Sequence, residues 1–373
     1  MRMKLAIRLA MAVVLVCTLS AKPARAQESN PPLKPVVPPL QFANLGDLKL
    51  QSGKVIHDFR LAYRTAGTLN AAKSNTVLFP TWLGGKSEDL ANLIGPANVF
   101  DTNKYFVVTI DAIGNGVSSS PSNSKTQPRL DFPEFTIRDM VESEYRLATE
   151  VLHVTHVHAI TGISMGGMQT FEWIVAYPDF MDVAVPIVGS PQSTAYDKLL
   201  WTSQIDALKL DPEWKDGKGT KSMAGGYAIY AEIESMNISS PAYRVALTPP
   251  GDFATFLTKA RADYKGSALS ACDDIRQRQA IMSLDIPGEY STTLADLPKR
   301  VHAKVFVVVS PEDHMVNPEP AIAYAKASGS PLLLMNTPCG HLSPDCVSTG
   351  PLVAQFLANP SSVQSQTLSG PAK

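Results

Sequence analysis

Cysteine is scarce in this sequence of 373 residues: there are four, and none of their spacings resembles a zinc site. One of them, Cys17, lies in an N-terminal segment that we expect to be removed. Of the other three, Cys339 and Cys346 flank the short loop CGHLSPDC. In an oxidising compartment we therefore expect a disulfide between these two and a free Cys272, with three unpaired buried thiols as the alternative.

A long hydrophobic run is also missing. The apolar stretch LAMAVVLVCTLSA, residues 9–21, is too short to span a membrane comfortably. Three cations precede it, and Ala-Arg-Ala at 24–26 follows it, which is typical of a secretory signal peptide over residues 1–26. An uncleaved membrane anchor is the alternative. We expect the mature chain, residues 27–373, to be periplasmic or secreted and to have no stable association with a membrane.

Charged residues are few as well, at 18% of the chain, and the formal net charge is −1. Cleavage after residue 26 would remove five cations and no anion, which leaves 28 cations, 34 anions and a net charge of about −6. A mildly acidic protein is a poor partner for nucleic acid or anionic lipid. No pattern calls for a cofactor or a metal ion, and the sequence leaves a homodimer open.

No internal repeat is visible, and short apolar runs alternate with helical patterns instead. Near-continuous hydrophobicity is typical of strands that are buried on both faces. Helical patterns follow Thr136, with apolar residues continuing to Leu152, and Ser164, where Pro178 ends the pattern. This alternation predicts an α/β fold with a mostly parallel sheet flanked by helices. The predicted strands are 77–81, 105–112, 157–164, 183–190, 303–310 and 331–336.

The segment 191–295 breaks this rhythm because it is polar, helix-prone and short of strand signals. We predict that it forms a helical cap over the C-terminal edge of the sheet. Composition indicates disorder only in the proline-rich run NPPLKPVVPPL at 30–40 and in the polar tail after Pro360.

The stretch AITGISMGGMQTFEWIVAYPDF, residues 159–180, places Ser164 between a predicted strand and a predicted helix. A sharp turn from strand to helix strains one residue, and glycines at 162 and 166 relieve the crowding around it. The helix start also offers unpaired N–H groups where an oxyanion would form. We interpret this as a nucleophile elbow with Ser164 as the nucleophile. The alternative is a polar residue in a glycine-rich turn, since G-x-S-x-G often occurs by chance.

A serine hydroxyl needs a base to take its proton, and in this fold the chain order is serine, acid, histidine. The segment VFVVVSPEDHMVNP ends its strand and offers Glu312 and Asp313, of which we favour Asp313. The segment LLLMNTPCGHLSPD ends the last predicted strand and offers His341. We predict Asp313 and His341 as the partners of Ser164.

The other six histidines are weaker candidates for the base. Three cluster in HVTHVH before the predicted catalytic edge, where a metal site is the alternative; two precede strand runs, and one adjoins the acid. These residues are His153, His156, His158, His57, His302 and His314.

An oxyanion hole needs two N–H donors. The helix start supplies the amide of Met165. The segment PTWLGGKSED after the strand at 77–81 supplies the second, and Leu83 beside Gly84-Gly85 is the best candidate. An ordinary turn is the alternative for the two glycines.

Several stretches resemble the homoserine O-acetyltransferase family of the α/β-hydrolase superfamily. They are LQSGKVIHDFRLAYRTAGTLNAAKSNTVLFPTWLGG, ITGISMGGMQTFEWIVAYPD, DPEWKDGKG, SPEDHMVNP and the serine-rich GNGVSSSPSNS, and the resemblance covers roughly residues 42–358. It implies the α/β-hydrolase fold. It also implies the same site: Ser164, Asp313 and His341 as the triad, with Leu83 and Met165 as oxyanion donors.

The sequence departs from that family where the substrate would bind. The biosynthetic members usually follow the catalytic histidine with an aspartate, whereas Leu342 stands here, and their cap arginine motif has no equivalent at 223–237 or 260–274. Together with export, this favours an ester hydrolase acting on a small-molecule ester or acyl donor. The alternatives are an O-acyltransferase and a non-catalytic binding protein with the same fold.

Overall fold

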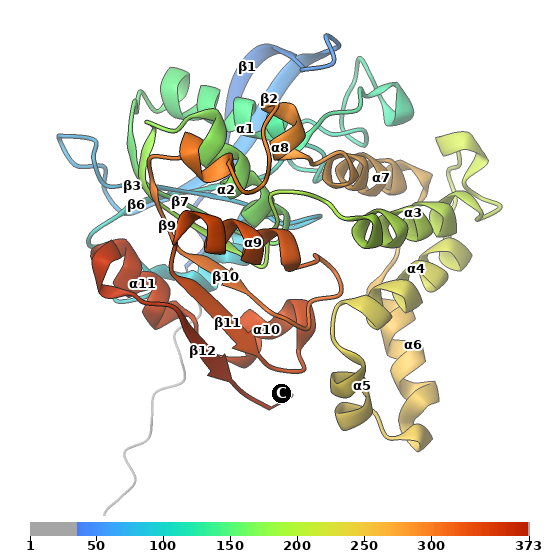
Figure 1. Cartoon of the computed structure of the whole chain (residues 1–373). Helices are drawn as coiled ribbons and strands as arrows, with labels where there is room; N and C mark the ends of the chain where they lie inside the picture. The colour runs from blue at the N-terminus through green and yellow to red at the C-terminus, as the bar shows by residue number, and fades with distance from the viewer. Residues whose placement is uncertain (1–35, 372–373) are drawn as a thin grey trace, which may run out of the picture. The chain divides into compact units, whose positions relative to one another are not determined.

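The computed structural model describes residues 36–371, so the predicted signal peptide at 1–26 lies outside the described residues. A ten-stranded sheet organises the described chain (Figure 1). The two N-terminal strands join antiparallel, and all later neighbours are parallel. In spatial order the strands are β1 (Gln41–Lys49), β2 (Val55–Ala66), β6 (Phe106–Ile110), β3 (Thr76–Pro80), β7 (Val157–Ile163), β8 (Met181–Ile187), β10 (Val307–Val309), β11 (Leu332–Asn336) and β12 (Gln366–Ser369), with β9 (Lys304–Val305) beside β8.

The six apolar runs all lie in the centre of this sheet, so the predicted α/β fold is confirmed. The run at 303–310 is interrupted at Phe306 and forms β9 and β10 rather than one strand. Both pieces keep the same register with β8, since Val305 pairs with Ala184 and Val308 with Ile187. The interruption is therefore a local irregularity in one parallel neighbour of β8.

Two parts of the sheet were not predicted from the sequence. The long hairpin β1–β2 has exposed positions along both strands, so its apolar residues form no continuous run. The tail after Pro360 was expected to be disordered, which is wrong: β12 pairs in parallel with β11. An edge strand pairs through its backbone on one side only. It can therefore carry polar side chains and needs no apolar run in the sequence.

Helices cover both faces of the sheet. Successive strand residues point to opposite faces, so the contacts of neighbouring residues show both layers. Leu78 of β3 packs into the cluster that contains α1 (Ile137–Arg146), α2 (Met165–Ala176) and α9 (Glu319–Ser328). Its neighbours on β3 pack into the cluster that contains the 3-10 helix η1 (Ser87–Leu93) and α11 (Gly350–Ala358). Each fully buried aliphatic side chain contributes roughly 1.5–3 kcal/mol. The predicted helix after Thr136 leaves α geometry at Leu147 and continues as a π-helical turn, Leu147–Val151.

The segment predicted as a cap contains six α-helices, of which all but the last lie to the right of the sheet in Figure 1. Three of them, 195–209, 224–237 and 268–282, contribute to a separate small cluster that includes Trp214, Met223, Tyr227 and Ile275. Between residues 191 and 295 the structure has isolated bridges but no β-strand. The helices are α3 (Ala195–Lys209), α4 (Ala224–Asn237), α5 (Pro241–Leu247), α6 (Phe253–Asp263), α7 (Ala268–Met282) and α8 (Ile286–Glu289).

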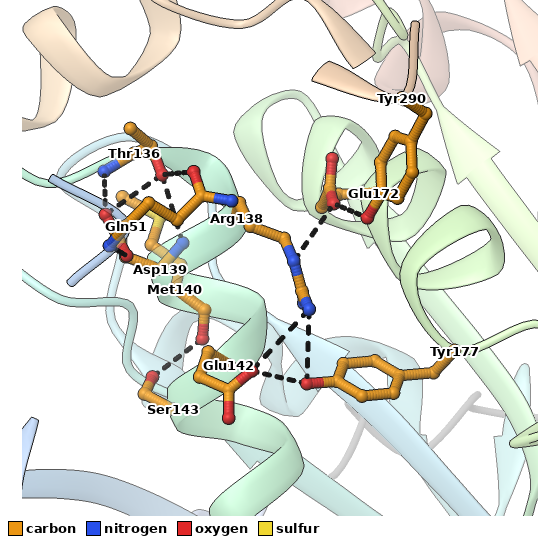
Figure 2. Close-up of polar contacts among 10 residues, drawn as sticks. All are labelled: Gln51, Thr136, Arg138, Asp139, Met140, Glu142, Ser143, Glu172, Tyr177 and Tyr290. Atoms are coloured by element: carbon orange, nitrogen blue, oxygen red, sulfur yellow. Dashed lines mark hydrogen bonds and ion pairs between the residues drawn. The ribbon is translucent and has the colours of Figure 1, made fainter. Parts of the chain in front are cut away.

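A polar network ties the end of this segment to α1 and α2 (Figure 2). Arg138 of α1 reaches toward Glu172 of α2, with Nε 3.6 Å from Oε1. Tyr290, just after α8, donates to the same Oε1 at 2.9 Å. Tyr177 donates to Glu142 at 2.5 Å and lies beside the Arg138 guanidinium. Burial, above all, raises the pKa of Glu172 above its ordinary value. The network fixes α2, the helix that begins at the predicted nucleophile.

The remaining short elements lie in the loops that connect the longer strands and helices, two of them within the segment 191–295. None of the helices within residues 36–371 is long and apolar enough to cross a membrane. The strands are β4 (Ile94–Gly95) and β5 (Phe100–Asp101), which pair with each other, and the short helices are α10 (Ser343–Cys346), η2 (Arg129–Asp131), η4 (Lys215–Gly217), η5 (Pro250–Asp252), η6 (Leu297–Arg300), η7 (Gly340–Leu342) and η8 (Pro360–Ser362).

Candidate active site

Ser164 sits at the turn between β7 and α2 in a strained conformation, with φ 58° and ψ −120°. Its N–H donates to the carbonyl of Ile187 on β8 at 2.9 Å. A Cβ at Gly162 would collide with the backbone of Gly166, and a Cβ at Gly166 would lie 2.6 Å from the carbonyl oxygen of Pro80. Only glycine fits at both positions, so the G-x-S-x-G pattern is required by the close approach of three backbone segments.

The structure brings the three predicted triad side chains together. His341 Nε2 lies 2.8 Å from Ser164 Oγ, and His341 Nδ1 lies 2.7 Å from Asp313 Oδ2. The His341 and Asp313 side chains are only 9% and 1% exposed. The hydroxyl, imidazole and carboxylate form one hydrogen-bonded line that is shielded from water at the carboxylate end.

The Asp313 carboxylate is held by the backbone as well as by His341. Its Oδ1 accepts from the N–H groups of Met315 at 2.8 Å and Val316 at 2.9 Å. These two bonds leave Oδ2 to face the imidazole. The rival carboxylate, Glu312, is exposed to solvent, so the structure favours Asp313 for this contact.

The loop that carries His341 is fixed on two sides. The Cys339–Cys346 disulfide is present and Cys272 is free and buried, which confirms the predicted pairing. The N–H of His341 donates to the carbonyl of Ile238 at 3.0 Å, just beyond α4. The cap segment therefore takes part in placing the imidazole.

Burial by itself lowers the pKa of the His341 imidazole, because it penalises the charged form. The charge and hydrogen bond of Asp313, together with the charge of Glu234, outweigh that effect and raise the pKa above its ordinary value. The site is thus arranged to stabilise an imidazolium, the species that forms when the serine proton is transferred.

Of the two predicted oxyanion donors, Met165 directly follows Ser164 in the chain, and Leu83 lines the same pocket as Ser164. Met165 is the first residue of α2, and Leu83 lies in the turn after β3. Within the described chain, neither amide donates a hydrogen bond. The turn is held by the cap: Gln277 Oε1 of α7 accepts from the Gly84 N–H at 2.8 Å, while its Nε2 donates to Ile113 O at 2.9 Å.

A second buried glutamine connects the two segments that carry the predicted oxyanion donors. Gln169 of α2 donates from Nε2 to Thr81 O at 3.1 Å and to Met165 O at 3.2 Å. The end of β3 and the start of α2 are therefore clamped together. The sequence offered a weak signal for Gln169, in the MGGMQ segment, and none for Gln277 in the cap.

These groups open into a pocket of about 370 Å³. Its walls combine residues of the sheet edge with residues of the cap, and no lysine or arginine of the described chain lines it. Leu342 is in the wall, directly after His341. The lining residues include Trp82, Leu83, Ser164, Trp201, Glu234 and His341.

Other candidates from the sequence are engaged elsewhere. The serine-rich loop 114–124 folds on itself, with Ser118 and Ser120 donating to backbone carbonyls. The HVTHVH cluster contacts Asp179, Asp182 and Leu357, and no group of three or more potential metal ligands exists within residues 36–371. His57 and His302 pair with surface aspartates.

The family model described as alpha/beta hydrolase fold matches residues 76–218. The chain has the α/β-hydrolase fold. Similar to this chain is a probable esterase of Corynebacterium glutamicum, 39% identical over 183 residues that make up 48% of this chain and 52% of the esterase. A homoserine O-acetyltransferase of Nitrobacter hamburgensis is 36% identical over 213 residues, 52% of each chain.

The chain thus spans about half the length of the curated relatives it matches. Over a longer stretch it superposes on the crystal structure of an acetylester hydrolase from Corynebacterium glutamicum, with a TM-score of 0.76 and 29% identity. That match covers 86% of this chain and 95% of the other. The predicted resemblance to the homoserine O-acetyltransferases is confirmed.

Proposed function

We propose that this α/β-hydrolase hydrolyses small-molecule esters through an acyl-serine intermediate. The observation that carries the proposal is the continuous hydrogen-bonded line from Ser164 through His341 to Asp313. The names of the relatives, esterase and O-acetyltransferase, belong to the same acyl-transfer chemistry.

His341 acts as the general base. Its Nε2 takes the proton of the Ser164 hydroxyl as the oxygen attacks the ester carbonyl. The resulting imidazolium is stabilised by Asp313, which also holds the ring in the tautomer with Nδ1–H. His341 then gives its proton to the leaving alkoxide, and the acyl group stays on Ser164.

The amides of Leu83 and Met165 receive the oxyanion in both tetrahedral intermediates. Removing one donor of this kind typically costs about 3 kcal/mol of transition-state stabilisation. In the second half of the reaction, His341 deprotonates a water molecule that attacks the acyl-serine. The product acid leaves and Ser164 regains its proton.

Transfer to an alcohol is the second candidate, and the homoserine O-acetyltransferase relatives are its support. Two observations favour water as the acceptor. Leu342 stands where the biosynthetic family has an aspartate for the ammonium group, and no cation of the described chain lines the pocket to hold a carboxylate. Export directed by residues 1–26 is part of the proposal and would separate the enzyme from cytoplasmic acyl donors.

Ser164→Ala tests the proposal with p-nitrophenyl acetate on the purified mature chain. We expect kcat/KM to fall by about 10⁵-fold or more, because the nucleophile and its base act as a unit. The control is Ser361→Ala, an exposed serine of η8 that should leave the rate unchanged. Equal rates in Ser164→Ala and the unchanged protein would leave a non-catalytic binding protein as the explanation.

Product analysis by mass spectrometry separates hydrolysis from transfer. The enzyme is given an acetyl ester in water with homoserine or a simple alcohol. We expect free acetate as the main product. Formation of O-acetylhomoserine faster than acetate would establish the transferase instead.

A further inference from the structure

Glu234 of the cap helix α4 lines the same pocket as Ser164 and His341. Its Oε2 accepts a hydrogen bond from Gln204 Nε2 at 2.6 Å, which fixes the carboxylate in place. In the mechanism proposed above this group acts only through its charge on His341, and the sequence analysis did not select it.

The charged side chains that line the pocket are mainly acidic. The other ionisable groups in its wall, besides His341, are Asp89 and Asp345, and the wall has no lysine or arginine of the described chain. Arg278 interacts electrostatically with Glu234 inside the cap. Its side chain is 1% exposed, and its Nη1 lies 3.5 Å from Asp274 Oδ1. Arg278 is thus engaged inside the cap and cannot meet a substrate.

A second polar group of this pocket's lining residues is also unused by the proposed mechanism. Trp201 of α3 lines the pocket and is only 2% exposed. Its indole N–H has no acceptor within the described chain. A buried donor without an acceptor is costly, and a polar atom of a bound ester would satisfy it.

We propose that Glu234 selects substrates by charge, so that esters with a cationic alcohol are used best, neutral esters less well and anionic esters least. The inference rests on the proposed ester chemistry and names its substrate class. A fixed carboxylate in a partly buried pocket attracts a cation and repels an anion more strongly than it would in water. Anionic acyl donors and acceptors are disfavoured by the same charge.

Three acetates of similar size test this charge selection: acetylcholine as the cation, 3,3-dimethylbutyl acetate as its neutral isostere and 4-acetoxybutanoate as the anion. We expect kcat/KM of the unchanged enzyme to fall in that order. In Glu234→Gln the ratio of the kcat/KM of the cation to that of the anion should fall at least tenfold. The ratio is taken within one variant, so a change in the basicity of His341, which the charge of Glu234 also influences, cancels. Glu234→Asp should keep the order.

The matched control is Glu232→Gln, on the same helix. Glu232 pairs with Arg261 and does not line the catalytic pocket, so this variant removes the same charge from the molecule and should leave the ratio unchanged. A ratio in Glu234→Gln within twofold of the unchanged enzyme overturns the inference while leaving hydrolysis intact. Should Glu234→Gln not fold, equal rates for the three acetates in the unchanged enzyme overturn it.

Failure of the proposed function looks different. In that case no acetate is hydrolysed faster by the unchanged enzyme than by Ser164→Ala, whatever its charge.

Discussion

The sheet with its flanking helices and the cap segment 191–295 meet at one pocket but supply different things. The sheet contributes Ser164, Asp313 and His341, each just after a parallel strand. The cap contributes Glu234 and Gln277 from the interior of helices α4 and α7. The sheet edge thus carries the predicted triad, whereas the cap adds side chains to the pocket wall and to the turn after β3.

The two regions also differ in how their polar groups are held. Asp313 is fixed by the amides of residues two and three positions further along its own loop. Gln277 instead joins Gly84 and Ile113, which are 193 and 164 positions away in the sequence. Local turns therefore position the acid, whereas the turn after β3 is also held by the docked cap through Gln277.

Among the variants that compare the two regions, the largest loss of activity is expected in the sheet, at Asp313. Asp313→Asn should lower kcat by about 10⁴-fold, because an amide cannot stabilise the imidazolium and favours the wrong tautomer. Steady-state kinetics with p-nitrophenyl acetate measure it. Glu312→Gln, the exposed neighbour, is the control and should keep its activity. A large loss in the control together with an active Asp313→Asn would reassign the acid.

A smaller effect is expected in the cap, at Gln277. Gln277→Ala removes the acceptor of the Gly84 N–H and should lower kcat by about ten- to a hundredfold with little change in KM, since a misplaced donor weakens oxyanion binding. Gln279→Ala is the matched control, because Gln279 is on the same helix but contacts Arg276 and Glu134 instead. If both variants keep full activity, the cap contributes only to substrate choice.

The smallest effect concerns stability in the helices behind the sheet. Burial raises the pKa of Glu144 from its ordinary 4.5 to about 8, although the Trp173 indole donates to it at 2.6 Å. The folded chain thus keeps a proton that the unfolded chain has lost, so stability should fall as pH rises from about 4.5 to about 8.

Glu144→Gln removes this cost. Relative to the unchanged protein, the variant should gain at least about 1 kcal/mol of unfolding free energy between pH 5 and pH 8, with hydrolysis little affected. Thermal unfolding over that pH range measures the gain. Glu150→Gln, at the half-exposed partner of Arg146, is the control. Parallel curves for Glu144→Gln and the unchanged protein would contradict the expectation.

Much of the site could be predicted because its signals are local. Ser164 has a glycine two positions away on each side and lies between an apolar run and an amphipathic pattern. Asp313 and His341 each follow an apolar run. Parallel strands end at one edge, so chain order was enough to bring them together. The disulfide was visible for the same reason, since Cys339 and Cys346 are seven positions apart.

The missed features depend on distant partners. The hairpin β1–β2 and the edge strand β12 are held by backbone pairing that leaves no apolar run in the sequence. Glu234 and Gln277 look like ordinary polar helix residues until α4 and α7 are packed against the sheet edge. Their roles follow from where a helix face lands in space, which no short pattern encodes.

The order of residues was sufficient to specify a sheet of buried parallel strands, a strained serine turn and the sequence of nucleophile, acid and base along the chain. These depend on local sterics and hydrophobic periodicity, which act over a few residues. Packing of the cap against the sheet edge added Glu234 to the pocket of the reacting serine and Gln277 to the turn after β3, because these contacts join segments that are far apart in the sequence.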